Sequence, residues 1–173
     1  MDVYVHYGTD VINKDHKYGK WKGGIFKPTG LWACEETSKD NWLTWSIDNR
    51  HSQSDFSKYV KFTLEDDAKI LTVEKTEDII PYLILSSRVS KAYKEKGISA
   101  LNIIDGCTLN EIKLKKQFDG IKLIHGDKYN ELHTTPGVFY SWDVDSIVIW
   151  NLDVVKVVST SNDCKKRRIR ICK

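Results

Sequence analysis

Residues 144–150, Val-Asp-Ser-Ile-Val-Ile-Trp, constrain the fold more than any other stretch of the chain. Most positions from Val144 to Trp150 are β-branched or aromatic, and Asn151 follows them. A short apolar run of this kind predicts a strand that is buried on both faces of a sheet. Asp143 and Asp145 stand at its leading edge, and side chains two residues apart point to the same face. A carboxylate beside an apolar strand costs free energy unless it is paired or used, so these acids belong either to the entering turn or to a site.

The length of 173 residues and the hydrophobic content of 40% predict one globular domain. We expect this domain to cover residues 1–163, followed by a basic C-terminal tail of residues 164–173. Of the 27 Lys and Arg residues, six lie in the tail, which leaves 21 against 24 acidic residues in the rest of the chain. The body is therefore not a basic nucleic-acid platform. The tail is predicted either to contact nucleic acid or to be a solubilising end or a charged edge strand.

Several classes of protein are excluded by what the sequence lacks. No run approaches the roughly 18 apolar residues of a membrane-spanning helix, and the first residues show no secretory signal pattern. The four cysteines form no CxxC pair or zinc spacing, and the five histidines are scattered, so we expect no metal site. These features predict a cytoplasmic protein without a membrane partner.

Strands and helices are both expected along the chain, which predicts an α+β domain. Residues 60–64 and 69–73 read as a hairpin around an acidic turn, and a helical stretch from Thr76 to Gly97 should be interrupted at Pro81. Thr37, Ser38 and Asp40 offer N-caps to a helix that contains Trp42 and Trp45. Further strands are expected at residues 3–7, 30–34, 121–124 and 153–158, and a short helix at residues 110–118.

Three groups of residues are candidates for binding a small molecule. His6 lies with Tyr4 on the less apolar face of the first strand, where a lone histidine is more often structural. Trp42 and Trp45, at i and i+3, form either part of the core or a platform for a ligand. Residues 11–29 hold three Gly and five Lys, and a loop of this kind suits an anionic ligand, although it has no phosphate-binding fingerprint.

Three motifs follow one another in a suggestive order. The first is His6-Tyr7-Gly8-Thr9 at the end of a strand, and the second is Gly30-Leu31-Trp32-Ala33, which precedes the helix with Trp42 and Trp45. The third is Val144-Asp145-Ser146-Ile147-Val148-Ile149. Together they resemble the ADP-ribosyltransferase superfamily, in particular its diphtheria-toxin/poly(ADP-ribose)-polymerase-like branch with a His-Tyr-Glu triad. The chain departs from the family pattern in that Tyr7 is inserted between His and Gly, Trp32 replaces Tyr, and Asp145 replaces Glu.

This resemblance implies a fold, a co-substrate and a set of roles. The fold would be an ADP-ribosyltransferase-like split β-sheet sandwich with flanking helices, and NAD would be the co-substrate, with no metal. Asp145 would stabilise the positive charge that develops on the ribose when the nicotinamide bond breaks. His6 would bind the adenosine ribose. The NAD site would also include Tyr7, Gly8, Thr9 and Gly30, with Trp32 and either Trp42 or Trp45 sandwiching the nicotinamide ring and Lys20 and Lys22 covering the pyrophosphate.

Three functions are compatible with the resemblance. The first is a mono-ADP-ribosyltransferase of toxin, phage-effector or regulatory type, with an unknown protein or nucleic-acid acceptor and NAD glycohydrolase side activity. The second is a nucleic-acid-directed relative, which modifies DNA or RNA or resembles an RNA 2′-phosphotransferase. Arg50 and Arg88 are the only arginines outside the tail, which counts against phosphotransferase chemistry. The third is an inactive binding module, which a lysine paired with Asp145 far from His6 would favour.

Overall fold

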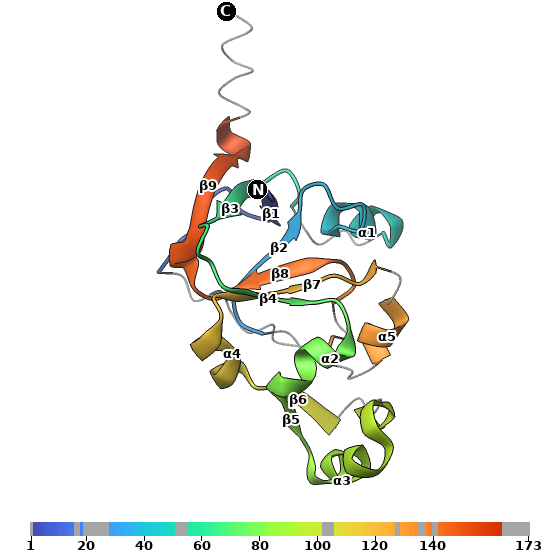
Figure 1. Ribbon diagram of the computed structural model, residues 1–173. Coiled ribbons are helices and arrows are strands. Elements are labelled where there is room, and N and C mark those ends of the chain that lie inside the picture. The colour runs from blue at the N-terminus through green and yellow to red at the C-terminus, as the bar shows by residue number, and fades with distance from the viewer. Residues whose placement is uncertain are drawn as a thin grey trace, which may run out of the picture.

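The computed structural model describes residues 2–15, 18, 28–50, 55–101, 106–126, 129–134, 138–139 and 142–163. Within these ranges the fold is α+β, with helices flanking a curled seven-stranded sheet of order β4-β7-β8-β2-β1-β3-β9 (Figure 1). Neighbouring strands are antiparallel, except that β4 and β7 are parallel. The strands are β1 (Tyr4–Tyr7), β2 (Leu31–Glu35), β3 (Tyr59–Leu64), β4 (Ile70–Val73), β7 (Gly120–Leu123), β8 (Ser146–Ile149) and β9 (Val155–Thr160).

Strand β8 confirms the prediction of a strand buried on both faces. All four of its residues are buried, and it lies between β7 and β2. Two glycines let the neighbouring chains approach it closely: a Cβ on Gly120 would lie 2.6 Å from the Val148 carbonyl oxygen, and one on Gly30 would lie 2.7 Å from that of Ile149. Side chains at these two positions would push backbone apart on both sides of β8.

The alternation of side chains along β8 separates two hydrophobic cores. Val148 packs with Trp142, Ile121 and Leu123, and we call this face of the sheet the Trp142 side. Ile147 and Ile149 pack on the opposite face, which we call the Asp145 side. Its core also contains Tyr4, Leu31, Ala33, Phe62, Val154 and Val155.

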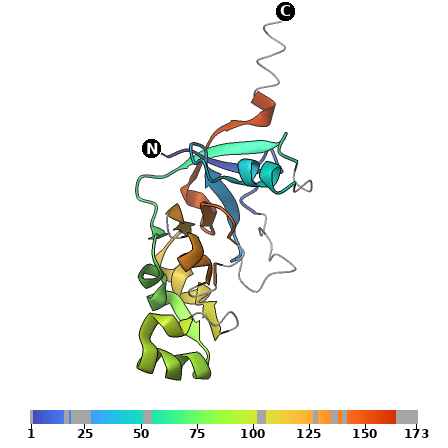
Figure 2. The same cartoon turned by 90° about the vertical axis from the view of Figure 1, so that its right-hand side faces the viewer.

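The chain between β4 and β7 covers the Trp142 side. Val89, Leu101 and Cys107 from this segment are buried in the same core as Trp142. Two views place its small sheet and longest helix at the end of the molecule farthest from β3 and β9 (Figures 1 and 2). The segment comprises α2 (Thr76–Ile79), η1 (Ile80–Tyr82), β5 (Leu83–Leu85), α3 (Ser87–Lys96), η2 (Gly97–Leu101), β6 (Cys107–Leu109) and α4 (Glu111–Gln117), and β5 pairs with β6.

The remaining helices are short. Helix α1 (Trp42–Asp48) contains the predicted tryptophan pair, but its N-cap is Asn41, whose side chain accepts hydrogen bonds from the backbone N–H groups of Leu43 and Thr44. The predicted caps Thr37, Ser38 and Asp40 were therefore wrong by one residue or more. Helix α5 (Tyr129–Thr134) stands in a stretch without a predicted element, and η5 (Leu152–Val154) precedes β9.

The predicted hairpin of residues 60–73 is wrong, although both of its strands exist. Strand β3 pairs with β1 and β9, whereas β4 pairs in parallel with β7 at the other end of the sheet. The acidic turn between them forms, with the Ala68 N–H donating to the Glu65 carbonyl, but it carries the chain across the sheet. The basic tail of residues 164–173 lies outside the described residues.

Candidate functional site

The three strands that carry the motifs are neighbours in the sheet. Strand β2 lies between β8 and β1, although β8 follows it by more than a hundred residues in the sequence. Tyr4 of β1 stands opposite Glu35 of β2, and Ala33 of β2 stands opposite Ile147 of β8. The fold therefore brings the ends of the first and third motifs to one part of the sheet.

His6 and Asp145 belong to the same side of this sheet. His6 is two residues from Tyr4, and its ring contacts Tyr18, which packs on the Asp145-side core. Asp145 is two residues from Ile147, which belongs to that core, and it lines a cavity together with Tyr4. Side chains two residues apart on a strand share a face. His6 and Asp145, the two predicted catalytic residues, thus lie on the same side of the sheet.

The carboxylate of Asp145 is held by His125, which follows β7. Its Oδ1 accepts a hydrogen bond of 2.7 Å from the backbone N–H of His125 and lies 3.2 Å from Nδ1 of the same residue. Burial acts to raise the pKa of Asp145, but the bonds from His125 outweigh it and keep the pKa below its usual value of 3.8. The side chain is 24% exposed, so an ionised carboxylate stands at a partly open position.

Asp40 faces the same ring nitrogen of His125 as Asp145 does. Its Oδ2 is 3.9 Å from Nδ1 of His125, and the ring is almost completely buried. The ligand atoms of Asp40, His125 and Asp145 all lie within 4.8 Å of one another, close enough for all three to reach one metal ion. The same contacts are accounted for by one imidazole nitrogen, Nδ1, that faces both carboxylates. No sequence pattern links these three residues, since Asp40 is predicted as a helix cap and His125 lies outside every predicted element.

A cavity of about 70 Å³ opens beside Asp145, and Lys122 of β7 lies in its wall. The ammonium of Lys122 is 3.0 Å from Glu35 and 3.5 Å from the Tyr4 hydroxyl. Burial acts to lower the pKa of Lys122, but its contacts with Glu35 and Tyr4 outweigh burial and raise the pKa above 10.5. The cavity thus has a mixed lining, with apolar side chains and a fixed cation near the Asp145 carboxylate. Its lining residues are Tyr4, Glu35, Ser38, Lys122, Ile124, Asp145, Ser146 and Ile147.

The environment of His6 fixes its protonation and its tautomer. Nδ1 lies 2.6 Å from the carbonyl oxygen of Trp32. Because a carbonyl only accepts, Nδ1 carries the hydrogen and the neutral ring leaves Nε2 as an acceptor. Burial lowers the pKa of His6 below 6.5, against the opposing effect of this bond, so the ring is neutral at neutral pH. A neutral Nε2 can accept a hydrogen bond from a hydroxyl group, which is the group that a ribose offers.

The residues after His6 shape the end of β1. Gly8 has a φ of +96°, which favours glycine, and its N–H donates to the Lys58 carbonyl. The hydroxyl of Thr9 and the backbone of Val11 lie 3.2 Å apart. Tyr7 packs its ring against Phe56 at 5.1 Å. The first motif thus ends strand β1 and begins the turn after it, and the roles of Tyr7, Gly8 and Thr9 in NAD binding stay predictions.

The second motif is placed differently from the first and third. Trp32 stands opposite Val148 and packs on the Trp142 side, with its ring centroid 4.5 Å from that of Trp142. Gly30 lies against the backbone of β8, as described above. These contacts place the Trp32 ring in the core opposite Asp145, so its predicted stacking on nicotinamide has no geometric support here.

Trp42 and Trp45 pack against each other at 5.5 Å in a T-shaped arrangement. They begin the helix that follows Asp40, and Ser38 of the same loop lines the cavity beside Asp145. The aromatic pair is therefore attached to the segment that reaches His125. Lys20 and Lys22, predicted to cover a pyrophosphate, lie outside the described residues.

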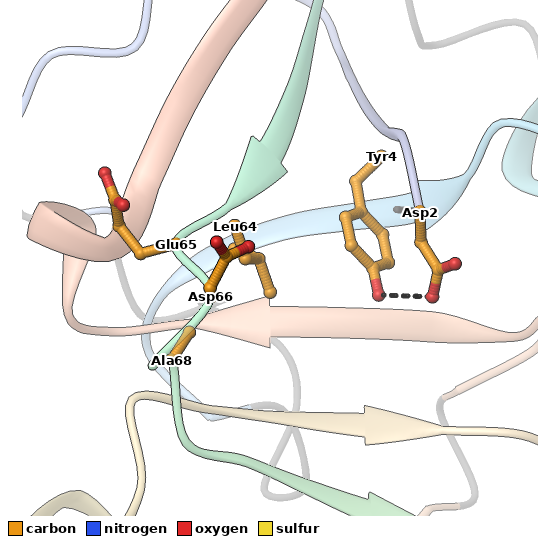
Figure 3. Close-up of a pocket in the computed structure, with 6 residues that line it drawn as sticks. All are labelled: Asp2, Tyr4, Leu64, Glu65, Asp66 and Ala68. Atoms are coloured by element: carbon orange, nitrogen blue, oxygen red, sulfur yellow. Dashed lines mark hydrogen bonds between the residues drawn. The ribbon is translucent and has the colours of Figure 1, made fainter.

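A second cavity, of about 190 Å³, shares Tyr4 with the first. Asp2, Glu65 and Asp66 are among its lining residues, the Glu65 carboxylate points away from Tyr4, and Tyr4 donates a hydrogen bond to Asp2 at 3.4 Å (Figure 3). Two of these acids have cationic partners, since Glu65 pairs with Lys156 and Asp2 lies 3.5 Å from the ammonium of Lys122.

No known protein family, curated protein or solved structure matches this chain. Among the helices of the described ranges, none is both long and apolar enough to span a bilayer.

Proposed function

We propose that this chain is an NAD-cleaving ADP-ribosyltransferase with an ADP-ribosyltransferase-like fold. The observation that carries the proposal is the adjacency of the three motif strands, with His6 and Asp145 on one side of the sheet. Neither the sequence order nor the spacing of the motifs required the strands to be neighbours.

The ionised carboxylate of Asp145 is the group on which the chemistry depends. In the proposed reaction the bond between nicotinamide and ribose breaks, its electron pair leaves with nicotinamide, and positive charge develops on the ribose. A fixed carboxylate in a partly buried position stabilises that charge more strongly than it stabilises the uncharged ribose of the substrate. An acceptor nucleophile, or water in the side reaction, then bonds to the ribose carbon and loses its proton.

His6 and the tryptophans hold the co-substrate in the proposal. The neutral Nε2 of His6 accepts from a ribose hydroxyl, which fixes the orientation of the dinucleotide. Since the Trp32 ring is engaged with Trp142, the cationic nicotinamide ring is assigned to Trp42 or Trp45, where an indole face contributes about 0.5–2 kcal/mol. NAD is the co-substrate and no metal takes part.

A nicotinamide-release assay with purified protein tests the proposal. We expect the wild type to release nicotinamide from NAD, and Asp145→Ala to lower the rate by about 10²–10³-fold, because one preorganised electrostatic group is lost. Asp153→Ala is the matched control, since Asp153 is a highly exposed acid outside the site, and its rate should equal that of the wild type. Absence of both NAD binding and nicotinamide release, with every acceptor tried, would refute the proposal.

A binding module without catalysis is the second candidate, because Oδ1 of Asp145 already contacts His125. This contact is with a histidine and not with the lysine that would have favoured the module. Calorimetric titration with NAD separates the two functions: a module binds NAD with unchanged affinity in Asp145→Ala and releases no nicotinamide.

A further inference from the structure

His125 contacts the candidate catalytic carboxylate through two separate groups. Its backbone N–H donates to Oδ1 of Asp145 at 2.7 Å, and its ring Nδ1 lies 3.2 Å from the same oxygen. Leu123 of β7 stands opposite Ser146 of β8 at the paired ends of these adjacent strands. His125 and Asp145 lie just beyond those ends. The contact is therefore built on the most buried part of the sheet.

The ring of His125 is itself held in place. It is 2% exposed, and Asp40 lies 3.9 Å from Nδ1, on the loop that leads into α1. Gly126, with a φ of +47°, turns the chain immediately after it. A ring buried to this extent does not reach a substrate in the cavity, so any influence on the reaction passes through Asp145.

The two contacts with His125 fall on one carboxylate oxygen. Among the described residues, none donates a hydrogen bond to Oδ2 of Asp145. A carboxylate fixed through Oδ1 presents Oδ2 in one orientation, and the residue lines the cavity in which a ligand would lie. Aspartate is one methylene shorter than glutamate, so the orientation of the carboxylate decides whether it reaches the ribose.

We infer that His125 is a positioning residue that fixes the Asp145 carboxylate for NAD cleavage, with Asp40 orienting its ring. This inference rests on the proposed function. The backbone N–H of His125 remains in every side-chain variant, so the ring contact can be removed without removing the whole link to Asp145.

Asn and Gln substitutions separate the two ring nitrogens. The side-chain N–H₂ of Asn lies about where Nδ1 of histidine lies, whereas that of Gln lies nearer Nε2. His125→Asn should keep the contact with Asp145 and retain kcat within a few-fold. His125→Gln and His125→Ala should lower kcat by about 10–100-fold with little change in KM, because the misplaced carboxylate is needed most in the transition state.

Carbon-13 NMR of the Asp145 carboxyl provides a readout that does not depend on activity. The resonance is assigned with Asp145→Asn. In the wild type the carboxyl should titrate below the ordinary aspartate range, in His125→Asn close to the wild type, and in His125→Gln at higher pH. Circular dichroism melts of the Asn and Gln variants show whether either is unfolded, and the titration is read on variants that remain folded.

The outcomes distinguish this inference from the proposed function. If wild type releases no nicotinamide, the proposed function fails, while the titration still decides whether the His125 ring holds the carboxylate. If wild type is active and His125→Gln has the wild-type kcat and the wild-type carboxyl titration, the positioning role is overturned. A stoichiometric metal in the purified protein that is lost in Asp40→Asn would also overturn it, because the imidazole would then be a ligand.

Discussion

The two sides of the central sheet are built from the same strands but hold different kinds of residue. On the Trp142 side, β7 and β8 contribute Ile121, Leu123 and Val148 to a core without charges. On the Asp145 side, β7 contributes Lys122, which pairs with Glu35 beside Asp145. On β7 the residue that faces the Asp145 side is therefore a lysine, whereas its neighbours Ile121 and Leu123 face the apolar core of the Trp142 side.

This difference indicates how stability and function are divided in the molecule. The segment between β4 and β7 covers the Trp142 side with helices and a small sheet, and the core residues there are almost completely buried. The Asp145 side has an apolar core at one end and the charged cavity at the other. Substitutions on the first side should act on the free energy of unfolding, and those at Asp145 should act mainly on activity.

The largest effect on stability is expected for Trp142→Ala. Trp142 is fully buried, and its ring contacts Trp32 at 4.5 Å and Phe139 at 5.3 Å. Removing an indole from a packed core costs about 3–5 kcal/mol in the free energy of unfolding, measured by urea denaturation. Ile47→Ala is the control, since this side chain is 68% exposed and should change stability by less than about 0.5 kcal/mol. Equal values for the two variants would contradict the assignment of the main core to the Trp142 side.

A smaller loss of stability is expected for Lys122→Met. The Lys122 side chain is 16% exposed and pairs with Glu35 and Asp2, so its removal leaves a partly buried carboxylate without its cation. The expected cost is about 1–3 kcal/mol. The double variant Glu35→Leu/Lys122→Met should recover most of this loss, because an apolar pair replaces the whole ion pair. Additive losses in the double variant would mean that the side chains act by packing and not as a pair.

Strands with strong local patterns could be predicted from the sequence, and their partners could not. The run from Val144 to Trp150 predicted β8 because its β-branched residues suit a strand buried on both faces. The predicted hairpin of β3 and β4 was wrong because a turn in the sequence shows that the chain changes direction, but not which strands pair. Pairing β4 with β7 buries Val73 and Leu123 together, and the sequence between 73 and 120 does not encode that contact locally.

The candidate site was predictable to the extent that its residues belong to motifs. His6 and Asp145 were identified in that way, and the structure places both on one side of the sheet. Asp40, Lys122 and His125 belong to no motif, and they meet Asp145 or its cavity because β7, β8 and β2 are adjacent. Lys122 is the one charged residue in the otherwise apolar strand β7, and it was the sequence feature that could have predicted a partly open face there.

The charge of Asp145 should make its own small contribution to stability, with a defined pH dependence. The pKa of Asp145 is lowered in the folded protein, so the stabilisation is fully present above its unfolded value near 3.8 and is lost as the pH falls through the lower folded value. Asp145→Asn removes this contribution. Urea denaturation between about pH 5 and pH 2 should therefore give a flatter pH dependence for the variant than for the wild type. Identical slopes would show that His125 does not favour the ionised carboxylate.

The smallest effect is expected for Lys115→Ala, which tests whether burial distinguishes the Asp145 side from the rest of the surface. Lys115 pairs with Glu111 at 2.7 Å, a distance similar to the 3.0 Å between Lys122 and Glu35, and also donates to the Thr29 hydroxyl, but its side chain is 34% exposed. An exposed pair of this kind contributes about 0.2–1 kcal/mol and is weakened by salt. Since the two pairs have similar geometry, a loss for Lys115→Ala equal to that for Lys122→Met would mean that burial is not what gives the Lys122 pair its strength. A loss that disappears in 1 M salt for Lys115→Ala and persists for Lys122→Met would establish that the ion pair beside Asp145 is shielded from solvent.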